Sequence, residues 1–94
     1  MPGEAVIGAA DVPQVSRPFR LQYEAAQSAW VLLYPEGMVK LSGSAGEIMQ
    51  RVDGRRSVDA VIRELESTFP GAADLRHDVL QFLEVARGRG WITT

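Results

Sequence analysis

The chain has 94 residues, a formal net charge of −2 and no cysteine. This length predicts one small domain, and the absence of cysteine excludes disulfides and thiolate chemistry. The slightly acidic balance argues against nucleic acid as a partner, because phosphate binding requires a basic face. No apolar run approaches the roughly 20 residues of a membrane span, and no basic residue precedes Arg17. We therefore expect no membrane contact, no secretion signal and a cytoplasmic location.

The first 16 residues show no regular hydrophobic pattern. Their period is interrupted by Pro2, Gly3, Gly8 and Pro13. We expect residues 1–16 to form a flexible N-terminal arm and residues 17–94 to form a single domain. The alternative is an arm that docks on its own or on a neighbouring subunit.

Two strands are predicted before residue 35. Apolar Phe19, Leu21 and Tyr23 alternate with polar residues, which indicates a strand with one exposed face. Residues 30–34, WVLLY, are apolar throughout, so this second strand needs cover on both faces. Three helices can cover one face only. The other face must meet the N-terminal arm, a second subunit or a partner, unless Trp30 and Tyr34 are simply half-exposed.

A tight turn follows, and the chain returns as a third strand. Pro35 fixes its own φ, and Gly37 can take a positive φ, so this pair predicts a turn. Met38 to Leu41 then form the third strand. After Leu41 the pattern becomes helical, so no later strand is predicted to pair with it. The free N–H and C=O groups of such an edge can bind another chain.

Three helices are predicted after the strands. Ser44 and Glu47 have capping-box spacing for the first helix, which Gly54 is placed to end. Ser57 caps the second helix, whose apolar residues Val58, Val61, Ile62 and Leu65 share one face. The third helix starts near Ala73 or Asp74 and ends at Gly88 to Gly90. Trp91 and Ile92 are then expected to extend and to plug the core.

Catalytic chemistry is not indicated by these residues. His77 is the single histidine, and with no cysteine it lacks the partners for a triad or a zinc site. We expect it to be an exposed residue in the first turn of the third helix. No phosphate-binding glycine motif occurs. We therefore predict a non-enzymatic protein with no metal and no cofactor.

Three segments carry a family resemblance: PFRLQYE, WVLLYPEGMVKLSGSAGEIMQRVDGRRSVDAVIRELESTFP and DVLQFLEVARGRGWI. They resemble the PqqD family, the small peptide chaperones of pyrroloquinoline quinone (PQQ) biosynthesis, over about residues 17–92. The resemblance implies an α+β, winged helix-turn-helix-like fold with a three-stranded antiparallel sheet followed by three helices. It also implies a RiPP recognition element that is not catalytic. Such an element binds the PqqA precursor peptide and presents it to the radical SAM enzyme PqqE.

In this family the peptide adds a strand to the third strand and packs against the third helix. We therefore predict a peptide-binding site on two walls. The strand wall is formed by Val39 and Leu41, or by the alternating residues Met38 and Lys40. The helix wall is formed by Asp78, Gln81, Phe82 and Val85. Lys40 either pairs with a peptide carboxylate or guards the edge against aggregation. An alternative function, suggested by topology alone, is a winged-helix DNA-binding module. A homodimer is a further possibility, suggested by the doubly apolar second strand.

Overall fold

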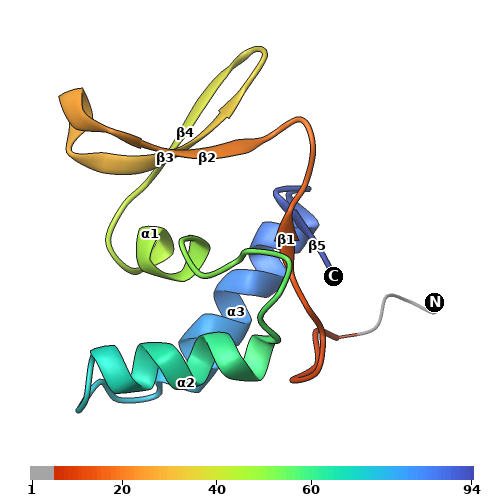
Figure 1. The fold of residues 1–94 in the computed structure, drawn as a ribbon, viewed down its shortest axis with the longest axis vertical. Helices are drawn as coiled ribbons and strands as arrows, with labels where there is room; N and C mark the ends of the chain where they lie inside the picture. Colours follow the sequence, from red (N-terminus) through yellow and green to blue (C-terminus); the bar gives the residue numbers. More distant parts are fainter. Residues whose placement is uncertain (1–5) are drawn as a thin grey trace.

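The computed structural model describes residues 6–94 (Figure 1). The elements in chain order are β1 Gln14–Val15, β2 Arg20–Glu24, a 3₁₀ turn Ala25–Gln27, β3 Ala29–Tyr34, β4 Gly37–Leu41, α1 Ser44–Met49, α2 Val58–Thr68, α3 Leu75–Gly88 and β5 Ile92–Thr93. Within these described residues, no helix is both long enough and apolar enough to cross a membrane.

The main sheet is antiparallel and has the strand order β2-β3-β4. Its register runs from Trp30 opposite Leu41 to Tyr34 opposite Gly37 on one side of β3, and β2 pairs with the other side. The three helices follow in sequence and lie on one side of the sheet (Figure 1). This arrangement confirms the predicted α+β class, with a three-stranded antiparallel sheet followed by three helices. It adds a two-stranded pairing of β1 with β5 that was not predicted.

The turn between β3 and β4 differs from the prediction at Gly37. Pro35 and Glu36 form the turn, and Gly37 begins β4 without a positive φ. A Cβ on Gly37 would lie 3.4 Å from the hydroxyl oxygen of Tyr34, so the glycine leaves room for that side chain. The prediction of a left-handed Gly37 was wrong because the two residues before it already reverse the chain.

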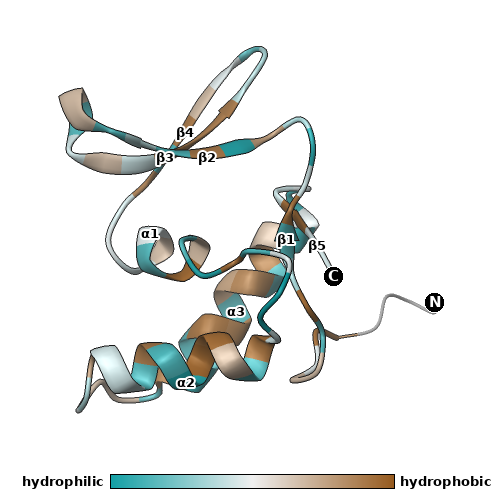
Figure 2. Cartoon of the chain, viewed as in Figure 1, coloured by the Kyte–Doolittle hydropathy of each residue, from teal (hydrophilic) through white to brown (hydrophobic). Residues whose placement is uncertain are grey.

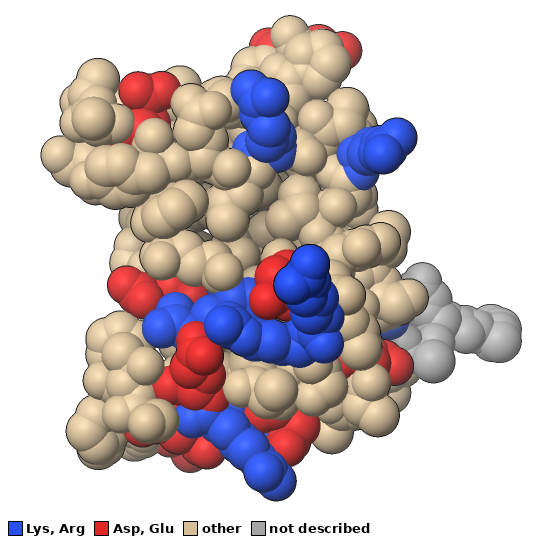
Figure 3. Space-filling model, in the orientation of Figure 1, with Lys and Arg blue, Asp and Glu red and all other residues tan. Residues whose placement is uncertain are grey.

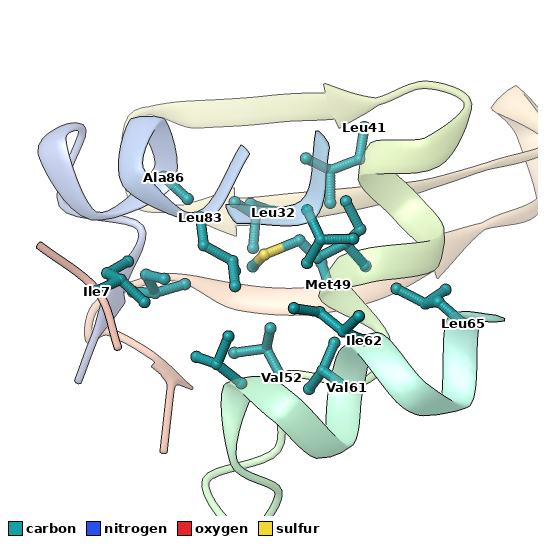
Figure 4. Close-up of a cluster of buried hydrophobic side chains, with 14 residues drawn as sticks. Ile7, Leu32, Leu41, Met49, Val52, Val61, Ile62, Leu65, Leu83 and Ala86 are labelled. Carbon is teal, nitrogen blue, oxygen red and sulfur yellow. The ribbon is translucent and has the colours of Figure 1, made fainter. Parts of the chain in front are cut away.

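The core lies between the sheet and the helices (Figure 4). Its buried residues are Ile7, Leu32, Leu41, Ile48, Met49, Val52, Val58, Val61, Ile62, Leu65, Val79, Leu83, Ala86 and Ile92. The predicted apolar stripe of α2 is fully included, and the inward sides of α2 and α3 are the hydrophobic ones (Figure 2). Burial of this shared cluster fixes β3 and β4 relative to α3.

On the face of the sheet that points away from the helices, one apolar side chain is fully buried. Val31 points to this face, lies between Gln22 and Lys40 in the register, and is fully buried. These two residues are its cross-strand neighbours, and long polar side chains commonly cover apolar neighbours with their aliphatic stems. Trp30 and Tyr34 are half-buried, as the simpler interpretation predicted. Residues 7–16 lie instead against the helices and β5.

Residues 7–16 do not form a free arm. Ile7 is 7% exposed in the core, and its amide donates to Oε2 of Glu84 at 2.8 Å. Further along, β1 pairs antiparallel with β5. The flexible-arm prediction was therefore wrong for residues 7–16, and docking on the same subunit is what these residues do. Their irregular sequence hid this because the contacts are mainly backbone hydrogen bonds. Residues 1–5 lie outside the described residues.

The docked segment also completes the start of α2. Ser57 Oγ accepts from the amide of Ala60 at 3.1 Å, which confirms the predicted cap. The first helical amides, those of Val58 and Asp59, donate to backbone carbonyls of the N-terminal segment at 2.8 and 3.0 Å. A helix leaves these amides without partners of its own, so the segment satisfies them.

The predicted capping box of α1 is not formed. The cap position is Gly43, with φ 57, and no side-chain hydrogen bond caps the helix. Glu47 instead accepts from Arg51 Nη1 at 3.1 Å, which removes its carboxylate from the helix start. Gly46 is buried where α1 packs on the sheet, and a Cβ there would be in ordinary contact with the Trp30 side chain, at 3.6 Å.

Candidate functional site

The outer edge of β4 is open. Within residues 6–94, β4 pairs with β3 and with no other strand. Tyr34 and Gly37 flank a two-residue turn and so form a hydrogen-bonded pair, and such pairs alternate along an antiparallel ladder. Every second residue from Gly37 therefore bonds to β3, whereas the N–H and C=O groups of Met38 and Lys40 point outward. The predicted open edge is present, and these two residues supply its backbone groups.

The side chains of β4 alternate between the two faces of the sheet. Val39 is half-buried and Leu41 is only 4% exposed, and both face the core. Met38 and Lys40 lie exposed on the outer face, where the Gln27 amide contacts Met38 Sδ at 3.6 Å. Leu41 therefore belongs mainly to the core, and Val39 is the apolar side chain of β4 that remains partly accessible on the helix side.

The four residues predicted on α3 lie on one helix face: Asp78, Gln81, Phe82 and Val85. Asp78, Gln81 and Val85 are exposed. Phe82 is half-buried and packs against the same hydrophobic core as Val39. The two predicted walls are thus connected through the core beneath them. On α3, the side chains of Asp78, Gln81 and Val85 are accessible to a partner.

A cavity of about 510 Å³ lies where β4 leads into α1. The ends of all three helices form its walls. Its larger apolar lining residues are Ile48, Leu65, Phe69, Leu75 and Val79. Glu47 and Asp78 place carboxylates at the same cavity. Among the eight residues predicted for the site, Asp78 is the one that lines it.

Phe69 is a candidate site residue that sequence reasoning missed. Phe69 lies four residues after Leu65 and so continues the apolar stripe of α2, yet it is 40% exposed. The available signal was a large apolar residue directly before Pro70 and Gly71, where the helix ends. Because the helix ends at this position, no further turn of α2 packs over Phe69, and its ring stays partly exposed.

The charged residues of the predicted site make no ion pair within the described residues, whereas several other charged residues on and between the helices do. Lys40 and Asp78 make no ion pair with the described residues. Arg51 Nε, by contrast, contacts Glu64 Oε1 at 2.7 Å. Figure 3 shows basic and acidic side chains intermixed over the helical half of this face. Such a surface does not present the uniform positive charge that duplex DNA requires.

Asp59 pairs with two arginines, Arg63 and Arg76, and so neutralises part of their positive charge. Arg76 Nη2 lies 2.9 Å and Arg63 Nε 2.8 Å from its two carboxylate oxygens. The hydrogen bond from Arg76, together with the charges of Arg63 and Arg76, lowers the pKa of Asp59 below its usual 3.8. The pair with Arg76 therefore links α3 to α2, whereas the pair with Arg63 lies within α2.

The described residues contain no group of three or more His, Cys, Asp or Glu side chains that could hold a metal. His77 is exposed in the first turn of α3, as predicted. In residues 6–94 the distinctive features are thus the open strand edge and the neighbouring apolar cavity. An exposed strand edge of this kind is typical of small domains that recognise an extended peptide.

The comparisons with known proteins specify this class. The family model for "Coenzyme PQQ synthesis protein D (PqqD)" matches residues 29–92, and the chain belongs to this family. The PqqA binding proteins of Azotobacter vinelandii and Pseudomonas putida (strain W619) are 55% and 54% identical to it over 82 residues. The match covers 87% of this chain and 89% and 90% of those proteins.

Two solved structures share the fold. The solution structure of the PqqD truncation of Methylobacterium extorquens PqqCD, described as a functional, stand-alone RiPP recognition element, matches with a TM-score of 0.75 and 27% identity. That match covers 94% of this chain and 95% of the other. The crystal structure of PqqD from Xanthomonas campestris matches with a TM-score of 0.51 and 28% identity, over 88% and 93% of the two chains. Membership of this family assigns a non-catalytic role.

Proposed function

We propose that this chain binds the PqqA precursor peptide in PQQ biosynthesis, as a strand added to β4, and presents it to the radical SAM enzyme PqqE. The observation that carries the proposal is the open edge of β4, with outward backbone groups at Met38 and Lys40. The name of the relatives, PqqA binding protein, supports the choice of peptide. We place this complex in the cytoplasm.

The proposed site has a strand wall of Met38, Val39, Lys40 and Leu41 and a helix wall of Asp78, Gln81, Phe82 and Val85. Main-chain hydrogen bonds to β4 contribute about 0.5–1.5 kcal/mol each and do not depend on sequence. Selectivity must come from side chains. Val39, Phe82 and Val85 offer apolar contacts, while the unpaired charges of Lys40 and Asp78 favour peptide residues of opposite sign.

A titration followed by NMR tests the location of the site. Unlabelled PqqA peptide is added to isotopically labelled protein, and the amide shifts are recorded. The expected result is that the largest changes fall on residues 37–41 and 78–85. Changes confined to α2 and the β1–β5 pair would contradict the proposed site.

A proline substitution tests the contribution of the backbone. Lys40→Pro removes the outward N–H of Lys40, and an edge strand tolerates proline where that N–H faces solvent. Loss of one hydrogen bond predicts a peptide affinity lower by about 3- to 10-fold. Lys40→Ala is the matched control, because it removes the charged side chain and keeps the N–H.

The comparison between these two variants is decisive. A folded Lys40→Pro protein with the affinity of Lys40→Ala would show that the β4 backbone does not bind the peptide. A separate assay addresses presentation, by measuring how fast PqqE modifies the peptide with and without this chain. The expected result is faster modification with the wild-type chain than with Lys40→Pro at subsaturating concentrations.

A further inference from the structure

The sheet has a second open edge, on β2. Within the described residues β2 pairs with β3 alone. Because even-numbered residues of β3 bond to β4, odd-numbered ones such as Val31 bond to β2, opposite Gln22. The backbone groups of Leu21 and Tyr23 therefore point outward from β2. This edge lies on the opposite side of the sheet from the edge that we assign to the peptide.

The sequence of β2, RLQYE, is self-complementary in one antiparallel register. A two-fold axis at Gln22 places Leu21 opposite Tyr23 of the second copy, and both of these residues have outward backbone groups. The same register places Arg20 opposite Glu24 of the second copy, twice by symmetry. We propose that two copies of this chain associate through their β2 edges in this register and form one continuous six-stranded sheet.

The charges support this pairing. Arg20 is exposed, and neither Arg20 nor Glu24 makes an ion pair with the described residues of its own chain. In the proposed register these two residues form a non-hydrogen-bonded pair, in which the side chains of an antiparallel ladder come closest. Opposite charges at such positions favour the pairing, and like charges oppose it.

The inner side of β2 offers apolar contact and space. Tyr23 is 51% exposed, and its ring meets the edge of the Trp30 ring at 5.6 Å between centroids. Beside this pair, a cavity of about 380 Å³ separates the end of the sheet from α1, with Gly46 and Gln50 in its wall. The second copy's Leu21 would cover the exposed part of Tyr23 without meeting a filled surface.

The edge of β4 lacks this self-complementarity. A two-fold axis at Val39 would place Lys40 opposite Met38 of the second copy, with no charge to match. Pairing of β2 with β4 of another copy brings no opposite charges together either, and such a heterologous contact would form rings or open chains of molecules instead of a two-fold dimer. The β2 dimer is closed, and it leaves both β4 edges free at the outer margins of the sheet.

Sedimentation analysis of the wild-type chain provides the first test. A short edge interface of this kind predicts a weak dimer, with a dissociation constant on the order of 100 μM. The expected result is a reversible monomer–dimer equilibrium that shifts toward monomer as salt is added. A wild-type chain that stays monomeric up to about 1 mM, or that forms open polymers, would overturn the proposal.

Charge reversal tests the register. Arg20→Glu and Glu24→Arg each create two like-charge contacts in a homodimer, so each variant alone should associate at least about tenfold more weakly. A mixture of the two variants restores both opposite-charge contacts and should dimerise as the wild type does. The double variant R20E/E24R should also dimerise. Far-UV circular dichroism verifies that each variant is folded.

The charge-reversal outcomes separate this register from any other interface. If each single variant dimerises as well as the wild type, Arg20 and Glu24 do not face each other and the proposal is wrong. If the mixture and the double variant remain monomeric, it is equally wrong. Recovery of the dimer in both cases supports it, because a general loss of surface charge would not be reversed by exchanging the two charges.

Discussion

Two adjacent residues near the N-terminus differ greatly in what their side chains contribute. Ile7 is 7% exposed and belongs to the core, whereas Val6 is 77% exposed. We expect Ile7→Ala to lower the free energy of unfolding by about 2–3 kcal/mol, because it leaves a cavity in a packed interior. Val6→Ala is the control and should change it by less than about 0.5 kcal/mol. Urea denaturation measures both, and equal effects would contradict the docking of this segment.

Asp53 stabilises the turn between α1 and α2 through its charge. Its Oδ1 accepts from the backbone amides of Arg56 and Arg55, both at 2.9 Å. These hydrogen bonds, that from Arg56 first, lower the pKa of Asp53 below its usual 3.8. A lowered pKa in the folded state means that the stabilisation is fully present above pH 3.8 and is lost as the pH falls through the folded value.

The stability of an Asp53→Ala variant should therefore depend on pH differently from that of the wild type. We expect the variant to be less stable than the wild type at neutral pH and the difference to shrink in strong acid. Denaturation midpoints measured across acid and neutral pH would show this. Ser44→Ala, which removes no titrating group, is a control for which we expect no comparable trend. A constant difference for Asp53→Ala would exclude the charged hydrogen bonds as its cause.

At the scale of single residues, the sequence predicted those features that depend on local geometry. Gly54 takes the expected positive φ, 76°, but it does not end the first helix as predicted, because α1 already ends at Met49. Ser57 caps its helix as predicted. Gly37 did not follow the prediction, because Pro35 and Glu36 already reverse the chain before it.

At the scale of the element, two serines offer a matched comparison. Ser57 Oγ accepts an amide at the start of α2, whereas α1, which begins at Ser44, has no side-chain cap. We expect Ser57→Ala to lower the free energy of unfolding by about 1 kcal/mol. Ser44→Ala should have an effect within about 0.5 kcal/mol. Thermal or urea denaturation would distinguish them, and a large effect of Ser44→Ala would mean that the capping box does form in solution.

Elements with a clear hydrophobic period were predictable, and those without one were not. The alternation in β2 and the four-residue spacing of α2 were sufficient to locate these elements, and the open edge of β4 followed from their order. β1 and β5 contain two residues each, too few to show a period. The cavity beside α3 could not be predicted from the sequence either, because it depends on where three helix ends meet.

At the scale of the whole molecule, the proposed site depends on segments far apart in the sequence. The residues of β4 and α3 are linked through the core, where Val39 and Phe82 contact the same cluster. The family resemblance placed residues on both segments, but the contact between a peptide and each side chain stays a prediction. If both proposals hold, one dimer carries two peptide sites on the outer margins of a single sheet.

The short pairing of β1 with β5 has a mechanical consequence. Gln14 lies opposite Thr93, so tension applied before β1 and after β5 acts on the same end of this pair. Its hydrogen bonds would then open one after another, as in a zipper, instead of sharing the load as sheared strands do. A molecule pulled by these two segments should therefore lose this pair at low force, while β3 and the helices remain folded.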